Sequence, residues 1–171
     1  CRSSGMGAYT QTGKFGLQLG AYEYEQAKST HTPEELAALK EQAKKYSGFM
    51  ISRDGLRVLP YGRIDNDYFE IEERRTNKAG RHYWSSRRLF GHIALHQQDN
   101  YRLKDKAGRE GFIINQAARE LKSLVINLLT NLADKFFGDK SDNRQIMLEA
   151  LSKAKQKQKK AQKASAKVNV K

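Results

Sequence analysis

Residues 48–62 read GFMISRDGLRVLPYG, and this stretch contains the clearest local structure signal in the chain. Its Asp54-Gly55 dipeptide lies between two apolar-rich runs. This indicates a two-residue hairpin turn, because both central positions of such a turn need a positive φ angle. Pairing outward from the turn predicts the register Arg53–Leu56, Ile51–Val58 and Phe49–Pro60. Pro60 then falls at a strand end, where a missing N–H donor is tolerated.

Two further segments alternate apolar and polar residues, which is typical of strands with one buried face. In residues 14–25 the apolar face consists of Phe15, Leu17, Leu19 and Ala21. In residues 89–98 it consists of Leu89, Gly91, Ile93 and Leu95. Both segments are therefore predicted to be strands of the same sheet as the hairpin.

Helical patterns separate and follow these strands. Residues 30–48 begin with Thr32 as N-cap, Pro33 in the first turn and Glu35 in the capping-box position, and Gly48 ends the pattern. A longer helical repeat follows, formed by Ile113, Ala117, Leu121, Leu124, Val125, Leu128, Leu132 and Phe136. We predict a short helical turn around 66–74 and a last helix over roughly 141–160. The order indicates an α+β fold, with helices on one face of a small, mostly antiparallel sheet.

The chain has 171 residues, which suits one well-cored domain with a tail. We expect a linker over 1–13, a folded domain over 14–138 and a basic helical or disordered extension over 139–171. Residues 152–171 hold eight lysines and no acidic side chain, so subtracting them from the net charge of +13 leaves +5 for the remainder. The high net charge is therefore weak support for nucleic-acid binding by the folded part.

The single cysteine, Cys1, allows no disulfide within the chain and favours a reducing, cytoplasmic setting. No apolar run approaches the roughly 20 residues of a membrane-spanning helix, so we expect no membrane partner. The first residues lack the apolar core of a signal peptide. They also lack an initiator methionine, which suggests a fragment of a longer protein.

Several enzyme-like patterns fail on inspection. GMGAYTQTGKF, residues 5–15, has glycine spacing one residue too long for a phosphate loop, and Phe15 replaces its magnesium-binding hydroxyl residue. His92 and His96 would lie about 13 Å apart on a strand, too far to share a metal ion. The carboxylates between residues 65 and 73 are best interpreted as a solvated acidic face. We therefore expect no metal site and no self-contained enzyme.

Residues 100–116, NYRLKDKAGREGFIINQ, combine dense charge with the start of the long helix. Free N–H groups and the positive end of a helix dipole favour phosphate, and an arginine supplies a planar fork for it. Gly108 and Gly111 would let the backbone approach such a ligand closely. The candidate contacts are Arg109, Lys106 and Lys104, and the alternative is a solvated basic loop.

The rival function is a small basic nucleic-acid-binding module. Its footprint would combine the lysine-rich tail with the arginines of the long connection, which are Arg74, Arg75, Arg81, Arg87 and Arg88. The tail lacks interleaved aromatic residues, which argues against base stacking and leaves phosphate contacts.

SRDGLRVLPYG at 52–62, LFGHIAL at 89–95 and LKDKAGREGFIINQAARELKSLV at 103–125 together resemble the second domain of the GHKL ATPases. That superfamily includes DNA gyrase B, Hsp90-type chaperones, mismatch-repair MutL proteins and sensor histidine kinases. The similarity is greatest to bacterial Hsp90-like or MutL-like ATP-binding proteins. It covers about residues 14–136.

The resemblance implies a transducer domain of the ribosomal-protein type, with a left-handed βαβ crossover. It implies that Arg109 contacts the γ-phosphate of ATP held with Mg by an upstream domain of the same chain, and that this contact couples nucleotide state to closure of a homodimer. Glu110 matches the acid that follows that arginine. Lys106 is the second candidate and Lys104 the third, since related branches use a lysine. This chain alone is expected to hold no cofactor.

Overall fold

The computed structural model describes residues 11–24, 26, 29–63, 65–77, 84–108, 110–137 and 141–168. Their helices and strands are, in chain order, β1 (Phe15–Ala21), α1 (Pro33–Tyr46), β2 (Gly48–Arg53), β3 (Leu56–Val58), α2 (Ile71–Asn77), β4 (Leu89–Leu95), α3 (Gln116–Phe137) and α4 (Asp142–Val168). The predicted α+β class is confirmed.

The strands form a four-stranded sheet in the order β1-β4-β2-β3. The β2–β3 hairpin pair is antiparallel, as predicted, and β1–β4 is also antiparallel. Strands β2 and β4 run parallel, so the sheet is mixed. A parallel pair needs a crossover connection, and this one contains β3 and α2. Strand β4 therefore lies between two strands that precede it in the chain.

The Asp-Gly hairpin has the predicted turn. Asp54 and Gly55 both have positive φ angles, of 49° and 81°. The inner two predicted pairs, Arg53–Leu56 and Ile51–Val58, are confirmed. The third is wrong, because β3 ends at Val58 and Phe49 pairs with Gly91 of β4 instead.

The predicted start of α1 is also confirmed. The Thr32 hydroxyl accepts the Glu35 N–H at 3.3 Å, and the Glu35 carboxylate accepts the Thr32 N–H at 2.8 Å. This reciprocal capping box satisfies two donors that the first helical turn would otherwise leave open. Pro33 occupies the first turn, where it removes no helical hydrogen bond.

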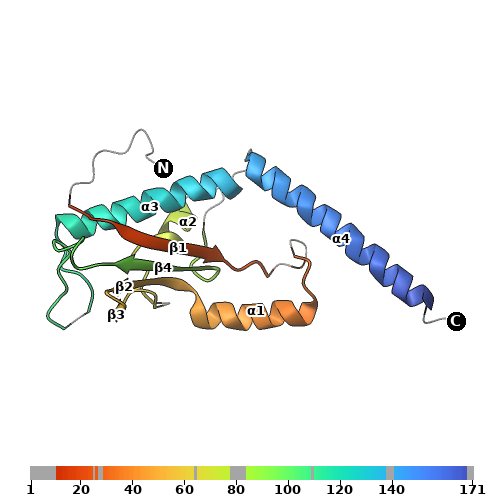
Figure 1. The fold of residues 1–171 in the computed structure, drawn as a ribbon, viewed down its shortest axis with the longest axis horizontal. Coiled ribbons are helices and arrows are strands. Elements are labelled where there is room, and N and C mark those ends of the chain that lie inside the picture. Colours follow the sequence, from red (N-terminus) through yellow and green to blue (C-terminus); the bar gives the residue numbers. More distant parts are fainter. Residues whose placement is uncertain are drawn as a thin grey trace.

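One face of the sheet carries the core. Leu89, Ile93 and Leu95 of β4 are almost completely buried, and α2 and α3 pack on the same side (Figure 1). The buried helical residues in this cluster are Ile71, Ala117, Ala118, Leu121, Val125, Ile126, Leu129 and Ala133. Within the described part of the chain, Leu36 and Ala43 of α1 are buried but lie outside this cluster.

Helix α3 starts later than its apolar repeat suggested. Ile113 precedes the helix and is 45% exposed, and Phe136 near its end is 42% exposed. The side chain of Asn115 accepts the Ala118 N–H at 2.9 Å, which places the N-cap at residue 115.

Helix α4 confirms the predicted C-terminal helix and spans 27 residues. It extends away from the sheet, beyond the end of α3 (Figure 1). None of the helices described by the structure is both long and apolar enough to cross a membrane.

Candidate functional site: a braced basic hairpin

The charged segment singled out from the sequence forms a small hairpin. The Lys106 N–H donates to the Gly111 carbonyl at 2.9 Å, and the Ile113 N–H donates to the Lys104 carbonyl at 2.8 Å. Asp105 and Phe112 lie opposite each other in an antiparallel bridge. We call residues 104–113 the basic hairpin.

Arg53, the last residue of β2, ties one side of the basic hairpin to the core. Its Nη1 lies 3.0 Å from Asp105 Oδ1, and its Nη2 donates to the Leu103 carbonyl at 2.7 Å. The guanidinium also packs over the Phe112 ring, 5.1 Å from its centroid. Arg53 is 9% exposed and the Asp105 side chain 35% exposed, so a buried guanidinium fork meets a carboxylate that water still reaches.

The segment after β3 holds the other side of the basic hairpin. The Tyr61 hydroxyl accepts the Phe112 N–H at 2.9 Å, and Leu59 forms a parallel bridge with Glu110. Gly111 has a φ of 93°, and a Cβ built on it would come within 3.0 Å of the Tyr61 hydroxyl. A side chain at position 111 would therefore force the hairpin away from its support.

Burial also sets the chemistry of this contact. It raises the pKa of Tyr61 above its ordinary value of 10.0, and the nearby Asp105 carboxylate acts in the same direction. The tyrosine therefore stays protonated at neutral pH and keeps its hydroxyl as a neutral support for the Phe112 N–H.

The junction with α3 differs from the arrangement expected for phosphate binding. Residues 110–113 form the closing side of the hairpin, so the helix does not follow directly on the basic residues. Asn115 accepts the Ala118 N–H and donates to the Arg102 carbonyl at 2.8 Å. One of the N–H groups expected to face a ligand is thus already bonded to a side chain of the protein.

The basic side chains of the hairpin remain available. Lys104 and Lys106 are exposed, and neither forms an ion pair with any residue that the structure describes. Asp105, the acid between them, pairs with Arg53 instead. Arg109, the first candidate contact, lies outside the described residues, so its predicted role stays a prediction.

The arginines of the connection between β3 and β4 are differently placed. Three of the predicted nucleic-acid contacts pair with carboxylates, in the pairs Arg74–Glu70 at 2.9 Å, Arg75–Glu72 at 2.8 Å and Arg88–Glu23 at 3.5 Å. Arg87 is exposed, and Arg81 lies outside the described part of the chain. Glu70 and Glu72 of the predicted acidic face thus pair with two of these arginines, and Glu23 pairs with the third.

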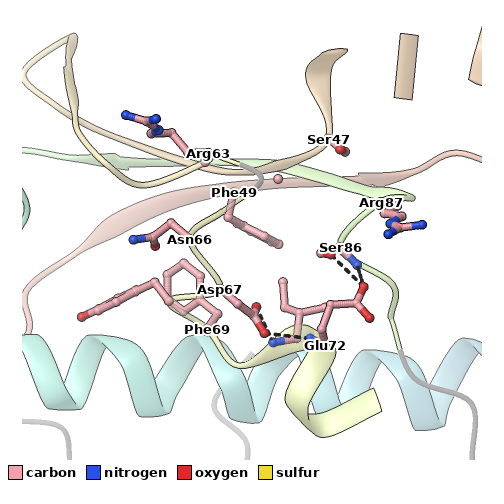
Figure 2. Close-up of a pocket in the computed structure, with 13 residues that line it drawn as sticks. Ser47, Phe49, Arg63, Asn66, Asp67, Phe69, Glu72, Ser86 and Arg87 are labelled. Carbon is pink, nitrogen blue, oxygen red and sulfur yellow. Dashed lines mark hydrogen bonds between the residues drawn. The ribbon is translucent and has the colours of Figure 1, made fainter. Parts of the chain in front are cut away.

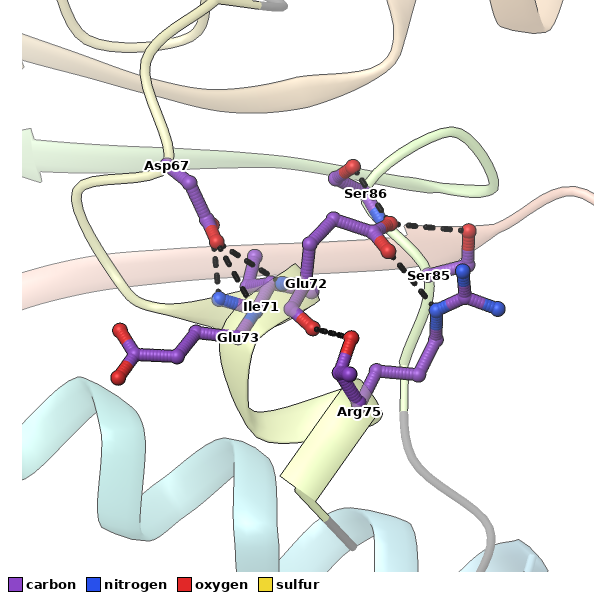
Figure 3. Close-up of polar contacts among 8 residues, drawn as sticks. Asp67, Ile71, Glu72, Glu73, Arg75, Ser85 and Ser86 are labelled. Carbon is purple, nitrogen blue, oxygen red and sulfur yellow. Dashed lines mark hydrogen bonds and ion pairs between the residues drawn. The ribbon is translucent and has the colours of Figure 1, made fainter. Parts of the chain in front are cut away.

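Glu72 is the most connected of these carboxylates (Figure 3). Its Oε1 accepts the Ser86 N–H and hydroxyl, both at 2.7 Å, and the Ser85 hydroxyl at 3.3 Å. Its Oε2 accepts Arg75 Nε at 2.8 Å. Burial works to raise the pKa of Glu72, but the hydrogen bonds from Ser86 and Arg75 outweigh it and leave the pKa below 4.5.

A pocket of about 60 Å³ lies between the start of β2, α2 and residues 86–87 (Figure 2). Its two acidic groups are already bonded within the protein. Asp67 accepts the N–H groups of Ile71 and Glu72 at 2.7 and 2.9 Å, and Glu72 accepts from Ser86. Ligand pockets are typically several hundred cubic ångströms, so this one is too small for a nucleotide.

A second, open groove of about 660 Å³ lies between α1 and the side chains of Tyr24, Gln26 and Arg88. Its aromatic residue, Tyr24, already contacts two cations, Arg88 at 4.7 Å and Lys40 at 5.8 Å from the ring centroid. The ring therefore serves the packing of α1 against this segment.

The two histidines have separate partners. His92 Nε2 lies 2.7 Å from the Ser52 hydroxyl, and His96 Nδ1 lies 3.3 Å from Asp54. Over the described ranges, no group of three or more His, Cys, Asp or Glu side chains is placed to hold a metal ion.

Sequence reasoning missed the residues that brace the hairpin. Arg53 and Tyr61 belong to the quoted stretch 48–62, but their contacts lie about fifty positions away in the chain. The available signal was a basic residue beside a tight turn, on the same face of the predicted strand as Phe49 and Ile51. Comparison of the chain with protein-family profiles, curated proteins and solved structures gave no match.

Proposed function

We propose that this chain acts as a transducer-type domain of a GHKL-like ATPase. In this role its basic hairpin contacts the terminal phosphate of ATP bound by a neighbouring domain. The support is the resemblance of the two segments that carry the family pattern, together with the way in which these segments meet. Residues 53–61 and 103–112 lie in direct contact through Arg53, Tyr61 and Leu59.

The observation that carries the proposal is the division of charge within the hairpin. The single acid between the lysines is turned inward to Arg53, while Lys104 and Lys106 are exposed and form no ion pair with a described residue. The hairpin is thus held in place by contacts within the chain. A group held in place in this way stabilises developing charge without the cost of reorganisation.

The basic hairpin contributes phosphate contacts alone. Arg109 would supply a planar fork, and Lys106 or Lys104 a point charge, to the γ-phosphate. The base, the ribose and the magnesium ion would be held by an upstream ATP-binding domain of the same protein. The ribosomal-protein-type fold, closure of a homodimer and a cytoplasmic location are parts of the same proposal.

The rival nucleic-acid module is less well supported in the connection between β3 and β4. Arg74, Arg75 and Arg88 would each have to leave a carboxylate in order to bind a phosphate. Surface ion pairs are weak, but breaking each of them costs some binding free energy. Lys104 and Lys106 form no ion pair with a described residue and do not carry this cost.

The test is ATP turnover by the protein that carries this domain together with its ATP-binding domain. Removing one positioned phosphate contact in such enzymes typically lowers turnover by about 100-fold or more. We expect this loss for Arg109→Ala, a smaller loss for Lys106→Ala, and nucleotide affinity within about threefold of the parent.

The matched control is Lys44→Ala, which removes an exposed lysine from α1, where it pairs with Glu41. Its turnover should equal that of the parent. Parent-like turnover in both hairpin variants would contradict the proposal, as would an equal loss in the control.

A further inference from the structure

Helix α4 exposes a stripe of lysines that the proposed function does not use. Lys153, Lys157 and Lys160 are all exposed, and none forms an ion pair with a residue that the structure describes. At 3.6 residues per turn, these three positions fall within an arc roughly 60° wide. We call Lys153, Lys157 and Lys160 the lysine stripe.

The opposite side of α4 faces the protein. Lys155 donates to the Gln26 carbonyl at 3.1 Å, and Gln158 donates to the Thr30 carbonyl at 3.0 Å. Leu151, one turn before Lys155, is half-buried on the same side. Because the anchored residues and the lysine stripe lie on opposite sides of α4, the stripe faces away from the Gln26 and Thr30 contacts. Figure 1 shows the helix itself extending beyond α3.

Glu149, one turn before Lys153, is the one acidic residue near the stripe. Glu149 is the last acidic residue of α4, and none follows it in the sequence. Lys153 and Lys160 lie seven residues apart, so the stripe is about 10 Å long. Over this length, each strand of a nucleic-acid duplex carries about three phosphates.

The residue composition of α4 indicates which kind of polyanion it would bind. Helices that bind membrane surfaces bury a face of large apolar or aromatic residues. The exposed large apolar residues of α4, which are Ile146, Met147 and Leu148, precede the lysine stripe, and residues 152–161 contain only alanines as apolar residues. Single strands are typically bound by stacking on aromatic rings, and α4 contains none. A regular array of phosphates on a duplex needs only exposed cations.

We propose that the lysine stripe of α4 binds the phosphate backbone of a nucleic-acid duplex without reading its sequence. The basic hairpin and the lysine stripe are separate surfaces, so this binding does not depend on the proposed ATPase role. Each lysine would displace condensed counterions from the duplex, which makes the affinity strongly dependent on salt.

The experiment measures binding of the full 171-residue chain to a random-sequence DNA duplex across a salt series, by fluorescence anisotropy. The variant is Lys153→Gln/Lys157→Gln/Lys160→Gln, because glutamine removes the charge and keeps a similar helix propensity. Loss of three phosphate contacts should reduce the slope of log affinity against log salt by about 3.

The matched control is Lys40→Gln/Lys44→Gln/Lys45→Gln, which removes the same charge from three exposed lysines of α1. Its slope should change by less than about 1, since these lysines contact no phosphate. Far-UV circular dichroism checks that both variants keep their helices. An RNA duplex is a second probe, and we expect it to respond to the α4 variant in the same direction.

Equal loss of slope in both triple variants would overturn the proposal, because net charge alone would then explain binding. Failure of the parent to bind a duplex would also overturn it. Tighter binding to anionic lipid vesicles, or to a single strand of the same length, would assign the stripe to a different partner.

Discussion

The basic hairpin and the connection over residues 63–88 are both rich in basic side chains, but they place these charges differently. In the connection, Arg74 and Arg75 pair with carboxylates three or four residues earlier. In the hairpin, Asp105 turns inward to Arg53, and Lys104 and Lys106 stay exposed without a described ion pair. Similar charge in the sequence thus gives neutralised charge in one region and available charge in the other.

The difference comes from local geometry. On a helix, residues three or four apart are neighbours, so the acids at the start of α2 meet the arginines near its end. On a strand, neighbouring residues point to opposite faces, so Asp105 and the lysines beside it separate. Charge density therefore predicts a binding surface only when the local structure is known.

The largest expected effect is on the brace of the hairpin. Arg53→Ala removes a buried cation and leaves Asp105 and the Leu103 carbonyl without their partner. Breaking such a pair typically costs about 3 to 5 kcal/mol. Because Asp105 is 35% exposed, we expect about 3 kcal/mol, measured by urea unfolding. The control Arg57→Ala should cost less than about 1 kcal/mol, and equal costs would contradict the brace.

A smaller effect is expected at the turn of the hairpin. Gly111→Ala places a Cβ at a φ of 93°, close to the Tyr61 hydroxyl. The strain should lower the free energy of unfolding by about 2 kcal/mol. Gly108→Ala is the matched control, since its Cβ would meet only Glu110 at 3.8 Å. If Gly111→Ala left the free energy of unfolding unchanged, the hairpin would not be held against Tyr61.

Tyr61→Phe should destabilise the protein less than Gly111→Ala. It removes the acceptor of the buried Phe112 N–H and keeps the ring, so unfolding should become easier by about 1.5 kcal/mol. Tyr101→Phe, at a tyrosine that is 59% exposed, should leave stability unchanged. Thermal unfolding monitored by circular dichroism measures both, and a neutral Tyr61→Phe would mean that the hydrogen bond carries no stability.

The smallest effect concerns the neutralised region and depends on pH. Glu72→Gln should cost about 1 kcal/mol at pH 7, because the carboxylate accepts several hydrogen bonds. The pKa of Glu72 lies below 4.5 in the folded state. Its stabilisation is therefore complete above pH 4.5 and is lost as the pH falls through the folded value. Glu73→Gln is the control. A difference in the free energy of unfolding between Glu72→Gln and the parent that persists at low pH would contradict the pairing.

Local signals predicted the local parts of the fold. The Asp54-Gly55 dipeptide fixed the turn and its first pairs, and Thr32 with Glu35 fixed the start of α1. Both patterns work because the interacting groups are neighbours in the chain. The alternation in residues 89–95 likewise identified the buried face of β4.

Long-range pairing was not predictable in the same way. Nothing local indicates that β4 enters between β1 and β2, or that β2–β4 is parallel. The start of α3 was predicted too early in the chain because Ile113 matches the spacing of the helical repeat. The Asn115 side chain caps the helix, so α3 begins after it. The candidate lysines were proposed from the local charge, the flanking glycines, the expected helix start and the family resemblance. The residues that brace the hairpin, Arg53 and Tyr61, lie far from it in the sequence and were not predicted.

Hydrogen exchange at the Lys106, Phe112 and Ile113 amides probes the basic hairpin itself, because these groups make the bonds that form and support it. We expect exchange at least about 100-fold slower than in an unprotected chain. We also expect selective acceleration at Phe112 in Tyr61→Phe. Exchange of all three amides of the parent at the unprotected rate would contradict a hairpin that is held in place by its own contacts.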